Sequence, residues 1–133
     1  MKSSNLILRL LFFIGLIPFS HTMVAQNVSK TALLKSWKLE KYYEEGEYYE
    51  PEVNEVNDYI DFKEDMTFSA MMEGELYSGT WMLNTNGAYI ELKYTTQEID
   101  KLRIKWLGTY SLVVIFDADY YRYTEVHYNS CEK

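Results

Sequence analysis

Hydrophobic and polar side chains alternate with a period of two along most of the chain. Ile60 and Phe62 alternate with Asp61 and Lys63, and similar segments recur from Trp37 to near the C-terminus. This alternation is typical of β-strands with one buried face and one exposed face. It predicts strands over residues 37–43, 60–63, 67–72, 77–83, 88–94, 102–106, 110–116 and 120–128.

The connections between these strands are mostly short turns. Asn84-Thr85-Asn86-Gly87 is the strongest hairpin signal, and only residues 44–57 form a long connection. Strands joined by hairpins can close into a barrel, which leaves no exposed sheet edge, whereas a sandwich needs more long crossovers. The predicted fold is therefore all-β, an eight-stranded antiparallel up-and-down β-barrel.

One short helix is predicted before the first strand. Ser29 is suited to cap a helix that runs to Lys35, and Leu33 and Trp37 lie four residues apart on one face. A helix this short is stable only when it packs on other elements. We expect it to act as a plug at one end of the barrel.

The N-terminal segment has the pattern of an export signal. Lys2 and Arg9 accompany an apolar run over residues 10–17, Pro18 ends the run, and Ala25 precedes a site suited to signal peptidase. An uncleaved membrane anchor is the alternative, but residues 6–19 fall short of the ~20 apolar residues that span a bilayer. We expect a signal peptide over residues 1–25, one domain over residues 26–133 without a membrane span, and export to the periplasm or out of the cell.

Composition adds an aromatic bias and a negative charge to this picture. Aromatic residues make up 17% of the 133 residues and include 13 tyrosines, which suits β-strands. Removing residues 1–25 deletes two of the 13 basic residues and none of the 20 acidic ones, so the net charge falls from −7 to −9. We expect no nucleic-acid partner, because an acidic domain repels phosphate backbones.

Few residues suit catalysis or metal binding. His127 is the only histidine outside the signal and Cys131 is the only cysteine, so we expect neither a histidine-based metal cluster nor an intramolecular disulfide. The sequence also has no G-x-S-x-G, phosphate-loop or dinucleotide-binding pattern. We expect no cofactor, no metal and no enzyme activity, with an isomerase or cyclase acting inside the barrel as an alternative.

Three short motifs resemble those of a known family. They are a leucine and a tryptophan at the start of the domain, an I-x-F strand followed by D-G-T-F, and G-x-W. The matching residues are Leu33, Trp37, Leu39, Ile60, Phe62, Asp65, Thr67, Phe68 and Gly79-Thr80-Trp81. The chain thereby resembles the bacterial lipocalin-like domain family over most of residues 29–126. Lys35 and Met66 stand where that family usually has glycine, and Met66 suggests a turn that does not need a positive φ. The resemblance implies a lipocalin-type barrel.

The predicted strands divide the inward side chains between two barrel ends. We expect one end to be packed shut by large side chains, namely Trp37, Phe62, Phe68, Trp81, Leu83, Trp106 and Leu112. The other end combines apolar area with polar tips and is the candidate ligand-binding mouth. Its residues are Tyr43, Met72, Tyr77, Tyr94, Phe116 and Tyr121 or Tyr123. A barrel filled throughout by these side chains is the alternative, because eight strands leave room for one small ligand at most.

Lys41 interrupts the inward face of the first strand, between Leu39 and Tyr43. A buried ammonium group needs a partner. Lys41 is therefore expected to reach the rim, to pair with a carboxylate such as Glu125, or to contact an acidic group of a ligand. A local break in the strand register would also explain its position.

The long connection over residues 44–57 contains six glutamates and no lysine or arginine. The family resemblance implies that it could act as a lid over the mouth. An acidic rim disfavours anionic ligands and favours cations or basic peptides. It lacks the D-x-D-x-D-G spacing of a calcium loop, and a purely solvated acidic loop is the simpler interpretation.

Two functions are compatible with this sequence. The first is an exported, lipocalin-like binding protein that holds a small, largely apolar ligand at the tyrosine- and methionine-rich end, without chemistry. The second is a filled barrel that binds a protein partner through residues 44–57 and exposed tyrosines. The tyrosines expected at that surface are Tyr42, Tyr48, Tyr49 and Tyr89.

Overall fold

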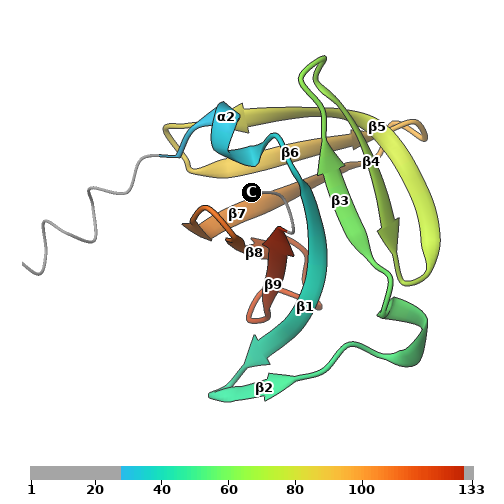
Figure 1. Cartoon of the computed structure of the whole chain (residues 1–133), viewed down its shortest axis with the longest axis vertical. Coiled ribbons are helices and arrows are strands. Elements are labelled where there is room, and N and C mark those ends of the chain that lie inside the picture. The colour runs from blue at the N-terminus through green and yellow to red at the C-terminus, as the bar shows by residue number, and fades with distance from the viewer. Residues whose placement is uncertain (1–27, 131–133) are drawn as a thin grey trace, which may run out of the picture.

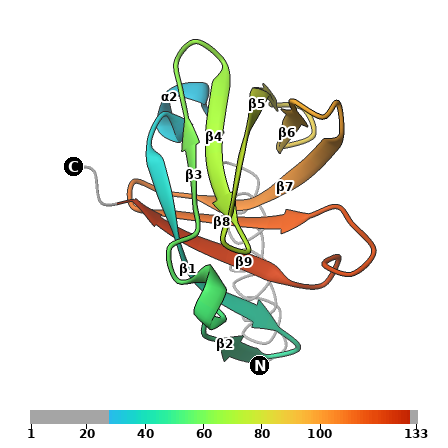
Figure 2. The same cartoon turned by 90° about the vertical axis from the view of Figure 1, so that its right-hand side faces the viewer.

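The computed structural model describes residues 28–130, which form a single closed sheet (Figures 1 and 2). The elements are α2 (Lys30–Leu33), β1 (Ser36–Glu44), β2 (Glu47–Tyr49), the 3₁₀ helix η1 (Val53–Glu55), β3 (Tyr59–Phe62), β4 (Thr67–Met72), β5 (Glu75–Asn84), β6 (Tyr89–Tyr94), β7 (Ile99–Leu107), β8 (Ser111–Phe116) and β9 (Glu125–Ser130). The predicted signal peptide and Cys131 lie outside the described residues.

Eight strands form the barrel, as predicted. From β3 to β9 each strand pairs antiparallel with the next in the chain, and β1 pairs with both β3 and β9 to close the ring. The extra strand, β2, pairs with the far end of β1 and extends the sheet beyond the ring. The all-β, up-and-down antiparallel barrel is therefore confirmed.

The contact between β1 and β3 is short. Only Ser36, Trp37 and Lys38 pair with β3, whereas the other end of β1 pairs with β2. The two neighbouring strands therefore diverge, and the connection that carries η1 crosses the space between them at the lower end in Figure 1. This divergence determines where the barrel opens.

Large aromatic side chains fill the opposite end. Trp37, Phe62, Phe68 and Trp81 are buried, and the rings of Phe62 and Trp81 meet edge to face at 5.1 Å. The indole Nε1 atoms of Trp37 and Trp81 donate to the carbonyl oxygens of Leu33 and Lys63, at 3.1 and 3.0 Å. Each indole thus buries apolar area while its N–H keeps a partner.

The N-terminal helix is shorter than predicted. Ser29 Oγ accepts from the backbone N–H of Ala32 at 3.2 Å, which is the expected N-cap, but the helix ends at Leu33 instead of reaching Lys35. The role of this turn as a plug stays a prediction.

A bulge in β1 changes which of its side chains face inward. The register with β9 shifts between Leu39 and Lys41, so an extra residue breaks the alternation. Leu39 faces the core, and after the bulge Tyr42 takes the inward position. The register break proposed for Lys41 is therefore present, and the expected inward positions of Lys41 and Tyr43 are not observed.

A second bulge places Trp106 on the opposite face from the one expected. The register between β7 and β8 shifts between Ile104 and Trp106. Leu107 is buried in consequence, whereas Trp106 lies on the outer face with 51% of its surface exposed. The prediction that Trp106 packs the closed end was wrong, because strict alternation does not anticipate the extra residue.

The turn between β3 and β4 does require a positive φ, contrary to the expectation from Met66. Met66 has φ 69°, and its backbone carbonyl accepts from Trp81 N at 2.9 Å. A side chain at such an angle costs roughly 1–2 kcal/mol. Packing of the partly buried Met66 side chain against the core offsets that strain.

Gly79, the glycine of the G-x-W motif, lets strands β5 and β6 approach closely. A Cβ atom at this position would lie 1.9 Å from the backbone oxygen of Lys93. We expect Gly79→Ala to lower the free energy of unfolding by about 3 kcal/mol, because the two strands would have to separate. Urea denaturation followed by tryptophan fluorescence measures this change.

Ser78→Ala is the matched control, since Ser78 is exposed beside Gly79 on the same strand and already carries a Cβ. It should change stability by less than about 0.5 kcal/mol. Equal stability of Gly79→Ala and Ser78→Ala would contradict this account of the motif.

Candidate functional site

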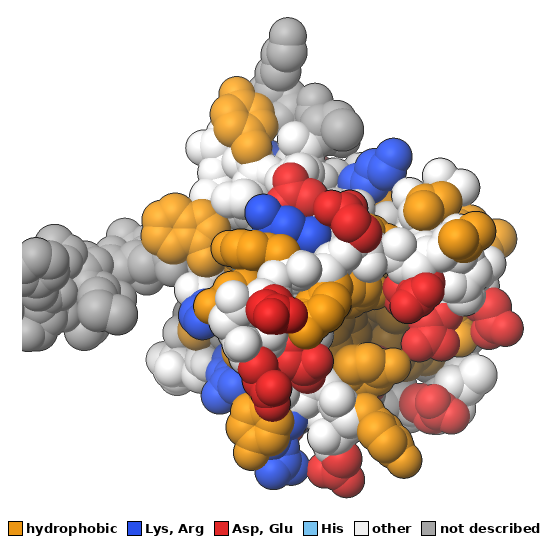
Figure 3. Space-filling model, turned by 90° about the horizontal axis from the view of Figure 1, so that it is seen from below, with side chains coloured by type: hydrophobic (Ala, Val, Ile, Leu, Met, Phe, Trp, Pro, Cys, Tyr) orange, Lys and Arg blue, Asp and Glu red, His pale blue; other side chains and the backbone are white. Residues whose placement is uncertain are grey.

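A cavity of about 450 Å³ opens at the barrel end opposite the tryptophans. In Figure 3, which views the molecule from below, hydrophobic side chains lie within a hollow and acidic side chains stand around it. The lining comes from β1, β4 to β9 and the connections that carry η1 and follow β8. The space lies where β1 and β3 diverge.

The walls of the cavity are largely apolar and aromatic. The side chains of Leu39 and Val126 are buried beneath the opening, and Met72 and Phe116 are partly buried. The aromatic members of the lining are Tyr42, Tyr77, Tyr94, Phe116, Tyr121 and Tyr128. Such a surface suits an apolar ligand that is held by contact area.

Three of the tyrosine hydroxyls at the opening donate to carboxylates of other elements or connections. Tyr42 Oη donates to Glu55 Oε2 at 2.7 Å and Tyr94 Oη to Asp100 Oδ2 at 2.6 Å. Tyr121 Oη donates to a third carboxylate, Glu73 Oε1, at 3.2 Å. Each pair joins residues from different parts of the chain, so together they brace the rim.

These hydroxyls hold their protons firmly. Burial, followed by the hydrogen bond to Glu55, raises the pKa of Tyr42 far above its ordinary value. Burial and the hydrogen bond to Asp100 raise the pKa of Tyr94 in the same way. Both side chains are therefore neutral hydrogen-bond donors at physiological pH.

Asp58 fixes the turn between β4 and β5 at the rim. Its carboxylate is buried and accepts from the backbone N–H groups of Glu73 at 2.8 Å and Gly74 at 3.1 Å. Burial raises the pKa of Asp58, while the two backbone hydrogen bonds oppose that shift. The backbone carbonyl of the same residue accepts from Leu39 N at 3.0 Å. Asp58 thereby ties β1, β3 and the turn together.

Tyr128 has an unusual environment at the floor of the cavity. Only 5% of its surface is exposed, and within residues 28–130 its hydroxyl forms no hydrogen bond. In that same part of the chain every fully buried side-chain nitrogen or oxygen has a partner. The Tyr128 hydroxyl is therefore not fully enclosed, and the cavity that it lines is the space it faces.

The structure brings together five of the eight side chains predicted for the mouth, namely Met72, Tyr77, Tyr94, Phe116 and Tyr121. Tyr43 lies outside the cavity, where its ring meets that of Tyr48 at 4.8 Å. The ammonium group of Lys41 lies 4.2 Å from the centre of the same Tyr48 ring. Tyr123 is 77% exposed in the connection between β8 and β9.

Several lining residues were not predicted from the sequence. Tyr42 takes the place expected for Tyr43 because of the bulge, and a break such as Lys41 in an apolar face is the signal that could have indicated it. Asp58 and Asp100 look like ordinary exposed acids in the sequence, since their partners are brought to them by the turn between β4 and β5 and by the pairing of β6 with β7. The sequence offers no short-range signal for them.

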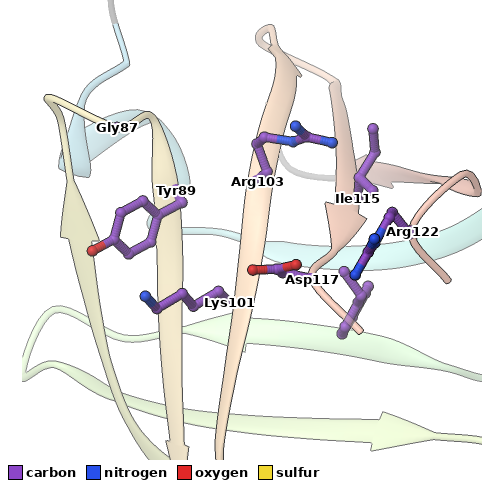
Figure 4. A pocket seen from close by; sticks show the side chains of 8 residues that line it. Gly87, Tyr89, Lys101, Arg103, Ile115, Asp117 and Arg122 are labelled. Atoms are coloured by element: carbon purple, nitrogen blue, oxygen red, sulfur yellow. The ribbon is translucent and has the colours of Figure 1, made fainter. Parts of the chain in front are cut away.

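A second depression of about 440 Å³ lies on the outer face of β6, β7 and β8 (Figure 4). It is lined by Tyr89, Lys101, Arg103, Asp117 and Arg122, among others. Lys101 Nζ lies 5.2 Å from the centre of the Tyr89 ring, and Arg122 pairs with Asp119 at 3.1 Å. Its charged lining residues are Lys101, Arg103, Arg122 and Asp117, so this groove is basic, unlike the acidic mouth.

Neither a metal cluster nor a membrane-spanning helix occurs among residues 28–130. No group of three or more His, Cys, Asp or Glu side chains there is arranged to hold a metal ion. No helix in the same range is long and apolar enough to cross a bilayer. His127 Nε2 lies 3.0 Å from Glu125 Oε1, and neither of these two residues lines the mouth.

Fold and site together define a closed antiparallel barrel with one packed end and one open, tyrosine-rich end. No family model, curated protein or solved structure matches the chain.

The two backbone hydrogen bonds to Asp58 lead to a prediction about stability. Asp58→Ala leaves the N–H groups of Glu73 and Gly74 without their acceptor. We expect it to lower the free energy of unfolding by about 2 kcal/mol, because hydrogen bonds to a charged group contribute about 1.5–3 kcal/mol. Chemical denaturation monitored by circular dichroism measures the loss.

Asn57→Ala serves as the control, since Asn57 is the exposed neighbour of Asp58. Its effect should stay below about 0.5 kcal/mol. A small effect of Asp58→Ala would mean that the turn holds its conformation without the carboxylate.

Proposed function

We propose that this protein is a lipocalin-like binding protein that holds a small, largely apolar ligand in the mouth of its barrel, without catalysing a reaction. The observation that carries the proposal is the cavity of about 450 Å³ at one end of a barrel whose other end is filled by aromatic side chains. Membership of the lipocalin-like family is part of the proposal, supported by the three sequence motifs and by a barrel architecture compatible with that family.

The size and lining of the cavity support this function. Small-molecule sites in proteins commonly occupy about 300–1,000 Å³ and combine apolar walls with a few polar groups. Here the apolar walls come from residues such as Leu39, Met72 and Val126. Burying ligand area against them would contribute about 25 cal/mol per Å².

Export is a second part of the proposal. Residues 1–25 have the charge and hydropathy pattern of a signal peptide, which would deliver the barrel to the periplasm or the medium. A carrier or scavenger of small apolar molecules is useful in such a compartment, because those molecules dissolve poorly in water.

A protein-binding surface is the second candidate function, and the hairpin of β1 and β2 favours it. Tyr48 and Tyr49 on β2 are exposed, and Val53 and Val56 are exposed in the connection that follows. In the described sheet β2 stands at the end of the strand order, where a strand from a partner could add to it. Tyr42 does not contribute to this surface, since its side chain lines the mouth.

Filling the cavity tests the binding proposal. Met72→Trp places a larger side chain in the mouth. We expect the affinity for the uncharged apolar probe N-phenyl-1-naphthylamine to fall about tenfold or more. Its anionic analogue 1-anilinonaphthalene-8-sulfonate serves for comparison. Fluorescence titration of each probe gives the affinities. The uncharged analogue is the decisive probe because the rim is acidic.

Met82→Trp is the matched control, because Met82 is an exposed methionine on β5 outside the cavity lining. It should leave probe binding unchanged. If neither substitution alters the affinity, the probe binds elsewhere, and the mouth is not the ligand site.

A further inference from the structure

We propose that the ligand of the mouth is cationic: an apolar body that carries a protonated amine or a similar positively charged donor group. This inference rests on the proposed function, since it names the chemical class of the ligand held in the same cavity. Three features of the cavity support it: its net charge, the direction of its hydrogen bonds and an unpartnered hydroxyl at its floor.

The first feature is a set of carboxylates without counterions. Five acidic residues line the cavity and no lysine, arginine or histidine does; the acids are Glu55, Asp58, Glu73, Glu98 and Asp100. The ion pairs between described residues lie elsewhere, at Lys41–Glu40, Lys105–Glu125, Arg122–Asp119 and His127–Glu125. The positive charge that would balance the mouth is therefore not supplied by residues 28–130.

The second feature is the direction of the hydrogen bonds. The hydroxyl protons of Tyr42, Tyr94 and Tyr121 all point to carboxylates. What remains free at the rim is mainly lone pairs, on carboxylate and on phenol oxygens. A ligand that donates hydrogen bonds fits this rim, whereas a carboxylate or phosphate would meet acceptors of its own charge.

The third feature is the Tyr128 hydroxyl, which is independent of the acidic rim. The side chain is 95% buried, its hydroxyl has no partner among the described residues, and it faces the cavity. Buried polar groups in proteins are almost always paired. Because this hydroxyl is open to the cavity that Tyr128 lines, it is a polar group at the floor with which a bound molecule can form a hydrogen bond.

The arrangement of these groups also sets the orientation of the ligand. Leu39, Val126 and Tyr128 are each more than nine-tenths buried, so they form the floor. The acidic side chains surround the opening in Figure 3. The apolar body therefore packs against the floor, where a polar atom of the ligand can reach the Tyr128 hydroxyl. The cationic group stays at the rim among carboxylates and tyrosine rings, where cation–π contacts add to the attraction.

Three probes of equal chain length test the charge preference: octylamine, octan-1-ol and octanoate, titrated into the protein by calorimetry near neutral pH. We expect octylamine to bind about tenfold more tightly than octan-1-ol, and octanoate to bind most weakly. The preference for the amine should shrink in about 1 M salt, because screening weakens the attraction between charges that solvent reaches.

A pair of double variants locates the effect. Glu55→Gln with Asp100→Asn removes two rim charges and should reduce the ratio of amine to alcohol affinity to about threefold or less. Asp61→Asn with Glu91→Gln makes the same change in net charge, but neither residue lines the cavity, so the preference should persist. Thermal unfolding by circular dichroism confirms that each variant is folded.

The outcomes separate this inference from the proposed function. Octan-1-ol binding as tightly as octylamine to the unmodified protein overturns the charge preference and leaves the apolar cavity standing. Binding of none of the three probes overturns the proposed function, and this inference with it. An amine preference that survives in the Glu55→Gln and Asp100→Asn variant also overturns the assignment, because the attraction would then arise elsewhere.

Discussion

The barrel depends on β1 being hydrogen-bonded along both of its edges. One edge pairs with β9 along most of its length, while the other shares three residues with β3 and then continues with β2. A sheet that closes into a ring has no unpaired edge strand within the ring. Where two neighbouring strands diverge, however, side chains and loops have to cover the gap between them. The connection that carries η1 covers this gap only partly. The pairing of β1 therefore both closes the barrel and leaves one of its ends open.

The chemistry of the opening follows from which side chains meet there. Tyr42 from β1, Tyr94 from β6 and Tyr121 from the connection after β8 each reach a carboxylate from another segment. Polar groups at the edge of a cavity need partners, and these pairs provide them without adding a positive charge. The rim is therefore braced but still negative, while the floor is apolar.

The sequence predicts the architecture well because alternation is a local property. The Trp37, Phe62 and Phe68 positions at the packed end follow from strand order and a period of two. A bulge shifts that period by one residue and reverses every later side chain, which is why Tyr43 and Trp106 were expected inside. The register of β1 is fixed by its pairing with β9, and so by residues far along the chain.

The candidate site was predicted in part for the same reason. Met72, Tyr77 and Tyr94 come from regular strand segments, and alternation places them at the mouth. Asp58 and Asp100 acquire their roles only when the strands pair, Asp58 through the turn after β4 and Asp100 through the hydroxyl of Tyr94 on the neighbouring strand. The uncompensated acids also have a consequence for stability. Like charges held together at a rim repel one another, so this cluster costs the folded barrel free energy that neutral side chains at the same positions would not.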